Sequence, residues 1–330
     1  MKKYLSLVMA LVLSPTALCC GAALADDAGT MAVLVPCSVG DPLWRCACAV
    51  WKSWRLIPAG ARVIETYDKA EYEDQVCSMA ELGANPIYCM WGDLSEVAIN
   101  HAADYPDTTF ILTDVYLKTD APNISSLSVD PYGASFIGGY LAAKKSEVGL
   151  VGFIAHADRA VSRRYRDGYV AGVEYANEKL GKNVQVQVAY VGTDQDPVKG
   201  SETAIQMIEE SKVDVIFQSA SLSGMGVISA CQEKGVACIG ADDYQGDEAD
   251  VVFWSVLKPF DEVLYNEGLS VVEGTFTAGD KNMGAAQGIA LYDDRDFEAL
   301  DDETKAEVTQ IVQDIVDGKI VLAADENVVK

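Results

Sequence analysis

The sequence has very little histidine, the side chain that enzymes use most often for acid–base chemistry. Only two histidines, His101 and His156, occur in 330 residues. Three common catalytic patterns are also missing: the Gly-x-x-x-x-Gly-Lys-Ser/Thr phosphate loop, the Gly-x-Ser-x-Gly nucleophile turn and the His-Glu-x-x-His zinc motif. These absences favour a binding protein over an enzyme.

Positive charge is also scarce. Lysine and arginine number 25 against 50 aspartates and glutamates, which gives a formal net charge of −25. A strongly negative protein repels phosphate backbones and anionic lipid surfaces. We therefore expect no nucleic-acid partner, and a ligand that is neutral or cationic unless the site locally reverses the field.

The amino terminus has an apolar run that is too short to cross a membrane. Two lysines precede a nearly wholly apolar stretch at residues 5–13, which Ser14-Pro15 interrupts. A spanning helix needs roughly 20 such residues. Ala23-Leu24-Ala25 then provides an Ala-x-Ala cleavage site. We interpret residues 1–25 as a secretory signal peptide, so the mature protein is expected in the periplasm with a net charge of −27 once the two lysines are removed.

Cysteine chemistry is left open by the sequence. Lipid anchoring at Cys19 or Cys20 is an alternative to cleavage, although the residues before them are not the small ones that a lipoprotein signal prefers. Disulfides are expected in an oxidising compartment, and an odd number of cysteines leaves at least one thiol unpaired. Cys231 and Cys238 bracket a helix end and the next strand, where a local disulfide would fit. Seven cysteines follow the cleavage site: Cys37, Cys46, Cys48, Cys77, Cys89, Cys231 and Cys238.

Short β-branched runs alternate with amphipathic stretches of helical period from Met31 onward, which is typical of parallel sheets covered by helices. The first series has predicted strands at 31–35, 62–65, 86–90, 109–113 and 125–129, and helices at 44–55, 72–82 and 96–105. The second has predicted helices at 135–145, 163–180, 200–210 and 226–235, and strands at 149–154, 185–190, 213–218, 237–240 and 251–255. A helix at 261–272, a strand near 288–291 and a helix at 302–317 follow.

The same alternation of strands and helices occurs twice along the chain, which predicts two lobes with a cleft between them. About 305 residues remain after the signal peptide, which is enough for two lobes. We expect the last part of the chain to return across a hinge, so that lobe 1 comprises 26–129 and 254–286, and lobe 2 comprises 130–253 and 287–330. The predicted fold is α/β, each lobe a parallel sheet flanked by helices, with the ligand beyond the carboxyl ends of the strands.

Aromatic and acidic residues follow the strands of the first lobe. Asp41 and Trp44 lie in the loop and helix start after strand 31–35, and Trp91 follows strand 86–90. Two tryptophans at strand ends suit a flat heteroaromatic ring, because aromatic faces gain from offset contact. The alternatives are that the tryptophans are core residues and that the Asp41 carboxylate caps the helix.

Small polar and acidic residues end two strands of the second lobe. Gln218, Ser219 and Ser221 lie where a strand gives way to a helix, whose free amides can bind an anion or a carbonyl oxygen. Asp242 and Asp243 end the next strand. Adjacent carboxylates suit a metal or acid–base work, but no residue at suitable spacing completes either site. We expect no metal and no cofactor, and assign Asp242 to hydrogen bonding with a ligand amino or ring N–H group.

Four segments together resemble a known family. In order and spacing the chain is similar to the basic membrane protein family, the PnrA-like purine-binding proteins that serve ABC importers. The resemblance implies a type I periplasmic-binding fold, hinge closure and delivery to an ABC permease in the inner membrane. It also implies a purine- or ribose-contacting role for Asp242, and it places Lys258 near the family's hinge-strand lysine. The segments are Ala102-Ala103-Asp104-Tyr105-Pro106-Asp107 with Phe110, Gly133-Ala134-Ser135-Phe136-Ile137-Gly138-Gly139-Tyr140-Leu141-Ala142-Ala143, Asp214-Val215-Ile216-Phe217-Gln218 and Gly235-Val236-Ala237-Cys238-Ile239-Gly240-Ala241-Asp242.

The residues that follow the first predicted strand indicate which kind of ligand the protein binds. Nucleoside-binding members usually show a ribose-holding aspartate there, followed by Asp-Lys-Ser-Phe-Asn. This chain has Pro36-Cys37 near that position and then Gly40-Asp41-Pro42-Leu43-Trp44, which looks like the Gly-Asp-x-Gly-Trp form of relatives associated with free nucleobases. A purine base such as adenine is therefore favoured over a nucleoside. The stretch at 155–159 departs from both subclasses.

The expected mechanism is closure of a hinge over the ligand, driven by contacts made only in the shut state. The ring would stack on Trp44 or Trp91 in the open form, and closure would bring Ser219, Ser221, Asp242 and Asp158 onto its polar edge. One alternative is a ligand-sensing lipoprotein or ectodomain subunit of a signalling system, with the same fold and a different small heteroaromatic ligand. Another is an exported hydrolase that uses Asp242 and Asp243.

Overall fold

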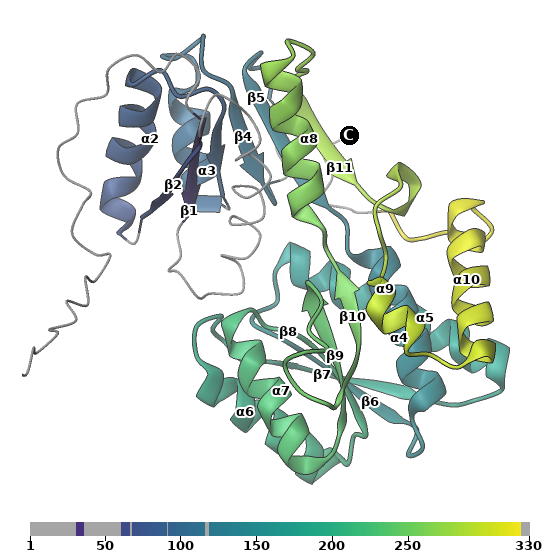
Figure 1. The fold of residues 1–330 in the computed structure, drawn as a ribbon. Coiled ribbons are helices and arrows are strands. Elements are labelled where there is room, and N and C mark those ends of the chain that lie inside the picture. Colours follow the sequence, from purple (N-terminus) through teal and green to yellow (C-terminus); the bar gives the residue numbers. More distant parts are fainter. Residues whose placement is uncertain (1–30, 36–60, 67, 91, 116–118, 325–330) are drawn as a thin grey trace, which may run out of the picture.

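The described chain forms two parallel β-sheets, each covered by helices on both faces (Figure 1). The computed structural model describes residues 31–35, 61–66, 68–90, 92–115 and 119–324. The predicted two-lobed α/β architecture is confirmed. The helix predicted at 44–55 lies outside the described residues.

The first sheet has the strand order β11-β5-β4-β3-β1-β2. Side chains alternate between its two faces, as the pleat requires: Met31, Val33 and Val35 pack on the α8 side, and Ala32 and Leu34 on the side of α2 and α3. Both faces are thus apolar, which explains the continuous hydrophobic run of β1. The strands are β1 (Met31–Val35), β2 (Ala61–Glu65), β3 (Ile87–Cys89), β4 (Phe110–Thr113), β5 (Ile124–Val129) and β11 (Gly279–Met283); the helices are η1 (Lys69–Glu71), α2 (Tyr72–Glu81), α3 (Gly92–His101) and α8 (Phe260–Val272).

The second sheet has the order β10-β9-β8-β6-β7. Val151, Phe153 and Ala155 of β6 face the core under α4, α5 and α10, whereas Ile154 faces α6 and α7. The strands are β6 (Leu150–Ala155), β7 (Gln185–Tyr190), β8 (Val215–Ser219), β9 (Ala237–Asp242) and β10 (Val252–Leu257). The helices are α4 (Tyr132–Lys145), α5 (Ala160–Leu180), α6 (Pro197–Gln206), the π-helical turn η2 (Met207–Ser211), α7 (Leu222–Lys234), η3 (Ala285–Gln287), α9 (Asp294–Glu298) and α10 (Asp302–Val316).

The chain passes from the second sheet back to the first after β10. Trp254 pairs with Ile239 and Leu257 with Asp242, both in β9. The expected boundary at residues 253 and 254 therefore falls inside a strand of the second sheet, and the return to the first lobe begins after Leu257. Continuous hydrogen bonding along β10 holds these residues in the second sheet.

The strand predicted near 288–291 is wrong. The returning strand is β11, which pairs with β5 along its whole length at the edge of the first sheet. Gly288, with φ of +81°, ends η3, and the segment after it is irregular. Its apolar residues are explained by burial, because Ile289 packs on the first-lobe core and Leu291 on the second-lobe core.

Helices α4 and α5 pack with their backbones almost in contact. A Cβ atom on Gly139 would lie 2.0 Å from the backbone oxygen of Tyr169, and one on Gly172 would lie 1.9 Å from that of Phe136. Only glycine leaves room for this approach. The Gly138-Gly139 pair of the sequence is therefore a packing feature of the second lobe.

Arg164 of α5 ties together segments at the junction of the lobes. Its Nε and Nη2 donate to the two carboxylate oxygens of Asp130 at 3.0 and 2.5 Å, and its guanidinium also donates to the carbonyls of Ala323 and Ala324 at 3.0 and 3.4 Å. The backbone N–H of Asp130 donates to Met283 at the end of β11, at 2.7 Å. Asp130 is thus bound to both lobes.

Candidate functional site

The carboxyl ends of β4, β9 and β10 converge on a buried charged cluster formed by Asp114, Asp242 and Lys258. Lys258 Nζ lies 2.6 Å from Asp114 Oδ2, and the two side chains are only 5% and 12% exposed. Asp114 follows β4 of the first lobe, whereas Lys258 follows β10 of the second. The ion pair therefore joins the lobes. The backbone N–H of Lys258 donates to the carbonyl of Asp242 at 2.9 Å, which places these two residues side by side.

Only one of the two carboxylate oxygens of Asp114 has a partner in the described structure. Its Oδ1 is buried without a hydrogen-bond partner in the described structure. Burial raises the pKa of the Asp114 carboxyl, Lys258 opposes the shift, and the Asp242 carboxylate adds to it. A buried polar atom without a partner costs free energy that a donor group can recover. Asp114 is thus ready to accept a hydrogen bond.

Three strand ends share a strained backbone. Asp114, Ser221 and Asp242 have φ of +54°, +53° and +71°, which non-glycine residues seldom adopt. Each follows or ends a strand at its carboxyl edge. Such strain concentrates at binding sites, where the surrounding structure enforces it.

Tyr165 of α5 fixes the orientation of Asp242. The buried Tyr165 hydroxyl donates a short hydrogen bond to Asp242 Oδ1. Phe217 of β8 packs edge-on against the Tyr165 ring, with centroids 6.0 Å apart. The second-lobe core thus determines where the carboxylate points.

Two serines line the end of β8. Ser219 is buried, and its carbonyl accepts from the backbone N–H of His156 at 3.4 Å. Ser221 precedes α7, but its side chain makes no capping hydrogen bond to that helix. The structure places both near the carboxyl edge of the second sheet, as the sequence predicts.

Gln218 has its amide engaged inside the protein. Its Nε2 donates to Gln245 Oε1 at 2.6 Å, and its Oε1 accepts from the N–H of Ala220 at 3.2 Å. Gln245 Oε1 also accepts from the N–H of Ala241 at 3.0 Å. Gln218 therefore positions the loops after β8 and β9.

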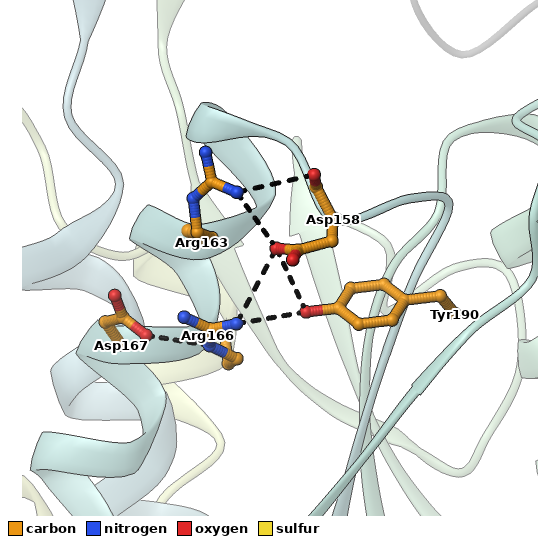
Figure 2. A network of polar contacts seen from close by, with 5 residues as sticks. All are labelled: Asp158, Arg163, Arg166, Asp167 and Tyr190. Atoms are coloured by element: carbon orange, nitrogen blue, oxygen red, sulfur yellow. Dashed lines mark hydrogen bonds and ion pairs between the residues drawn. The ribbon is translucent and has the colours of Figure 1, made fainter. Parts of the chain in front are cut away.

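Asp158 lies in an exposed network at the start of α5 (Figure 2). Its Oδ1 accepts from Arg163 Nη1 at 3.3 Å and from the Tyr190 hydroxyl at 3.4 Å, and lies 3.7 Å from Arg166 Nη1. Arg166 also pairs with Asp167 at 2.8 Å. The Asp158 carboxylate thus accepts two hydrogen bonds and has Arg166 as a further ion-pair partner, and no contact joins it to the cluster of Asp114, Asp242 and Lys258 in the described structure.

His156, which the sequence did not place in the site, directly follows β6 and lies beside the end of β8, where its N–H bonds the Ser219 carbonyl. Its carbonyl accepts from Gly192 N–H at 2.8 Å, and its ring Nδ1 is buried without a partner in the described structure. Burial lowers its pKa, whereas Asp194 and Asp242 act in the opposite direction. Burial thus favours the neutral form of the His156 imidazole.

Asp41, Trp44 and Trp91 lie outside the described residues. Within the part of the chain that is described, no three His, Cys, Asp or Glu side chains are grouped as metal ligands would be. In that same part, no helix combines the length and apolarity needed to span a membrane.

Two lobes, each a parallel sheet flanked by helices, that meet at the carboxyl ends of their strands have the fold of periplasmic-binding-type proteins. The chain belongs to the Bmp family, described as ABC transporter substrate-binding protein PnrA-like, which matches residues 58–326. The family is one of substrate-binding proteins, not of enzymes.

Individual relatives agree with this family. Basic membrane protein D of Borreliella burgdorferi is 29% identical over 263 residues, which covers 77% of this chain and 76% of the relative. The ABC transporter nucleoside-binding protein BmpA of Lactococcus lactis is 24% identical over 285 residues, covering 79% of this chain and 77% of the relative. The crystal structure of an ABC transporter solute-binding protein from Aeropyrum pernix superimposes with a TM-score of 0.77 at 22% identity, covering 90% and 94% of the two chains. The similarity to that structure supports the fold.

Proposed function

We propose that this protein captures a purine nucleobase or nucleoside by hinge closure, with the base favoured, and delivers it to an ABC importer. The observation that carries the proposal is the Asp114–Lys258 ion pair beside Asp242, where one carboxylate oxygen of Asp114 is buried without a partner. This cluster lies where strands of both lobes end.

The cluster suits a flat ligand that both donates and accepts hydrogen bonds. Asp114 and Asp242 accept from ring N–H or amino groups, and Lys258 donates to a ring nitrogen or a carbonyl oxygen. Two carboxylates against one lysine disfavour an anion. Purine bases meet these requirements, and so do nucleosides, whose ribose hydroxyls are further donors. The nucleoside-binding name of the Lactococcus lactis relative keeps the nucleoside in the proposal.

Closure follows from the position of the two carboxylates. Asp114 belongs to the first lobe and Asp242 to the second. A ligand that contacts both gains more from the shut state than from the open one, so binding shifts the population toward closure. Stacking on Trp44 or Trp91 would supply the aromatic contact, worth roughly 1–3 kcal/mol for a base on an aromatic side chain. Asp158 would reach the ligand only by leaving its contacts with Arg163 and Tyr190.

Calorimetric titration of the purified protein with adenine, guanine, adenosine, guanosine, uracil and amino acids tests the ligand. We expect adenine or guanine to bind more tightly than its nucleoside, and pyrimidines and amino acids not to bind. Binding of another ligand class, with no purine response, would overturn the assignment.

The matched variants are Asp242→Asn and Asp243→Asn. Hydrogen bonds to charged groups contribute about 1.5–3 kcal/mol, so Asp242→Asn should raise the Kd roughly 10- to 150-fold. Asp243 is exposed and accepts from the N–H of Tyr244 at 2.7 Å, so Asp243→Asn should leave the Kd nearly unchanged. Equal effects of the two changes would contradict the placement of the site.

The family supports a role in delivery outside the cytoplasm. Substrate-binding proteins of ABC importers are extracytoplasmic, and we propose that residues 1–25 direct export to the periplasm and that an inner-membrane permease receives the ligand. Uptake of radiolabelled adenine should require this gene, and the Asp242→Asn gene should not restore it. Uptake that persists without the gene would favour a sensing role.

A further inference from the structure

We infer that the connection from β6 to α5 binds a carbonyl oxygen of the ligand through His156 and Ser162, so that the protein binds a 6-oxopurine more tightly than a 6-aminopurine. This inference rests on the proposed function, because it names the purine class that the same site prefers. The connection runs from His156, directly after β6, into the first turn of α5, which begins at Ala160 and includes Ser162.

Each end of this connection has a buried polar atom without a hydrogen-bond partner in the described structure, His156 Nδ1 and Ser162 Oγ. Ser162 is only 1% exposed. A serine in a helix can bond the carbonyl four residues earlier, but the Asp158 carbonyl accepts from Arg163 Nη1 at 3.5 Å. A buried hydroxyl without a partner costs free energy that an acceptor can recover. Both atoms are therefore available to a ligand.

The start of α5 favours an acceptor at this place. Arg159 is the N-cap residue, and its side chain makes no capping hydrogen bond. The first N–H groups of a helix have no partner within the helix, and they carry a partial positive charge. Residues 160–162 therefore present donor groups to an oxygen atom of a ligand.

The helix face that carries Ser162 points toward the end of β9. Tyr165 lies three residues after Ser162 and hence on the same face of α5. Its hydroxyl donates a hydrogen bond to Asp242 Oδ1, where β9 ends. His156 is held at the same edge of the sheet, because its N–H donates to the Ser219 carbonyl at 3.4 Å. The donors of the connection thus lie on the side of the site where Asp242 accepts.

Donors for an oxygen beside an acceptor for an N–H group match a lactam. Asp242 accepts from the ring N–H, and Ser162 and a neutral His156 donate to the adjoining carbonyl oxygen, whose two lone pairs accept both bonds. A 6-oxopurine has N–H and C=O side by side in its ring. Adenine has at these positions a ring nitrogen, which accepts one hydrogen bond, and an amino group, which only donates. Adenine therefore leaves one donor of the connection without a partner.

Calorimetric titration of the purified protein with hypoxanthine and adenine tests the preference, because the two bases differ only at this edge of the ring. We expect hypoxanthine to bind about threefold to tenfold more tightly, as the loss of one neutral hydrogen bond predicts. Equal affinities, or tighter binding of adenine, would overturn the inference and leave the proposed function intact. A protein that binds no purine would overturn the proposed function as well.

Ser162→Ala separates a ligand contact from a structural role. The hydroxyl has no partner in the described structure, so the Tm without ligand should not fall. The Kd for hypoxanthine should rise about threefold to tenfold, and the Kd for adenine should stay nearly unchanged. Ser135→Ala is the matched control, because Ser135 Oγ is also buried without a partner in the part of the chain described, but lies on α4 against Gly168. An equal loss for both bases in Ser162→Ala would contradict the carbonyl contact.

Two changes at His156 test the second donor. Asparagine keeps an N–H donor at the same number of bonds from the Cα atom as Nδ1, so His156→Asn should retain most of the preference for hypoxanthine. His156→Leu has no donor and should lose it. A His156→Leu protein with the full preference would show that the imidazole does not contact the carbonyl oxygen.

Discussion

Replacing Lys258 by methionine isolates the energetic role of the buried cluster. Methionine keeps the length and apolar stem of the side chain but removes the ammonium group 2.6 Å from Asp114 Oδ2. Asp114 is then a buried carboxylate with no positive partner at that oxygen, beside Asp242. Removal of one member of a buried ion pair costs about 3–5 kcal/mol. For a lobe of about 150 residues, this corresponds to a fall in Tm of roughly 6–20 °C.

Scanning calorimetry at pH 7 and pH 5 measures this effect and its origin. Asp114 already has a raised pKa because of burial, and loss of Lys258 raises it further. The variant carboxyl therefore takes up a proton more readily, and the loss of Tm should be smaller at pH 5 than at pH 7. Changing Asp114→Asn in the same protein should recover part of the loss, since the uncompensated charge is gone.

The control is Lys305→Met. Lys305 pairs with Glu298 at 3.0 Å, but the glutamate side chain is 75% exposed. Exposed pairs contribute about 0–1 kcal/mol, so the Tm should move little. A Lys258→Met protein as stable as Lys305→Met, or strict additivity with Asp114→Asn, would refute the reasoning.

Three further changes test other parts of the structure. Tyr165→Phe removes the donor that orients Asp242 and should weaken purine binding about tenfold in a titration; unchanged affinity would show that the orientation is irrelevant. Because burial lowers the pKa of His156, the unfolded chain takes up a proton first, so stability should fall as the pH drops below about 6.5, and His156→Gln should reduce this fall in Tm measurements across pH. Gly139→Ala would place a methyl group 2.0 Å from a backbone oxygen of α5 and should cost about 3 kcal/mol or more by thermal unfolding, whereas Gly92→Ala, with nothing within 4 Å, should be tolerated.

Much of the fold could be predicted because buried parallel strands are continuous apolar runs. The strand at 31–35 and the strand at 185–190 were predicted with the observed bounds. Strand β11 was missed because its sequence, Gly-Asp-Lys-Asn-Met, is polar and partly exposed at the edge of the sheet. β11 belongs to the sheet because it pairs with β5. Its Lys281 also forms an ion pair with Glu267 of α8 at 2.6 Å. Pairing between strands that are far apart in the chain produces no periodic hydrophobic pattern within the strand's own sequence.

The arrangement of the candidate site could be predicted only in part for a similar reason. The sequence names Asp242 and Lys258 as candidates, and the structure places these two residues side by side at the ends of β9 and β10. Asp114 also follows a strand directly, so the same rule of strand ends could have found it. Its importance comes from an ion pair with a residue 144 positions away, and that contact exists only after the two lobes assemble. The internal engagement of Gln218 likewise depends on Gln245 of another loop.

The position of Asp130 limits how the lobes can move. Its main chain is bonded to Met283 at the end of the first sheet, and its side chain is clamped by Arg164 of the second lobe. A wide translation of one lobe would break one of these attachments, whereas a rotation about an axis through Asp130 would preserve both. We therefore expect Asp130 to act as a pivot. The connection near residues 130, 164 and 283 would stay nearly fixed, and the carboxyl ends of the other strands in the two sheets would move along an arc around it.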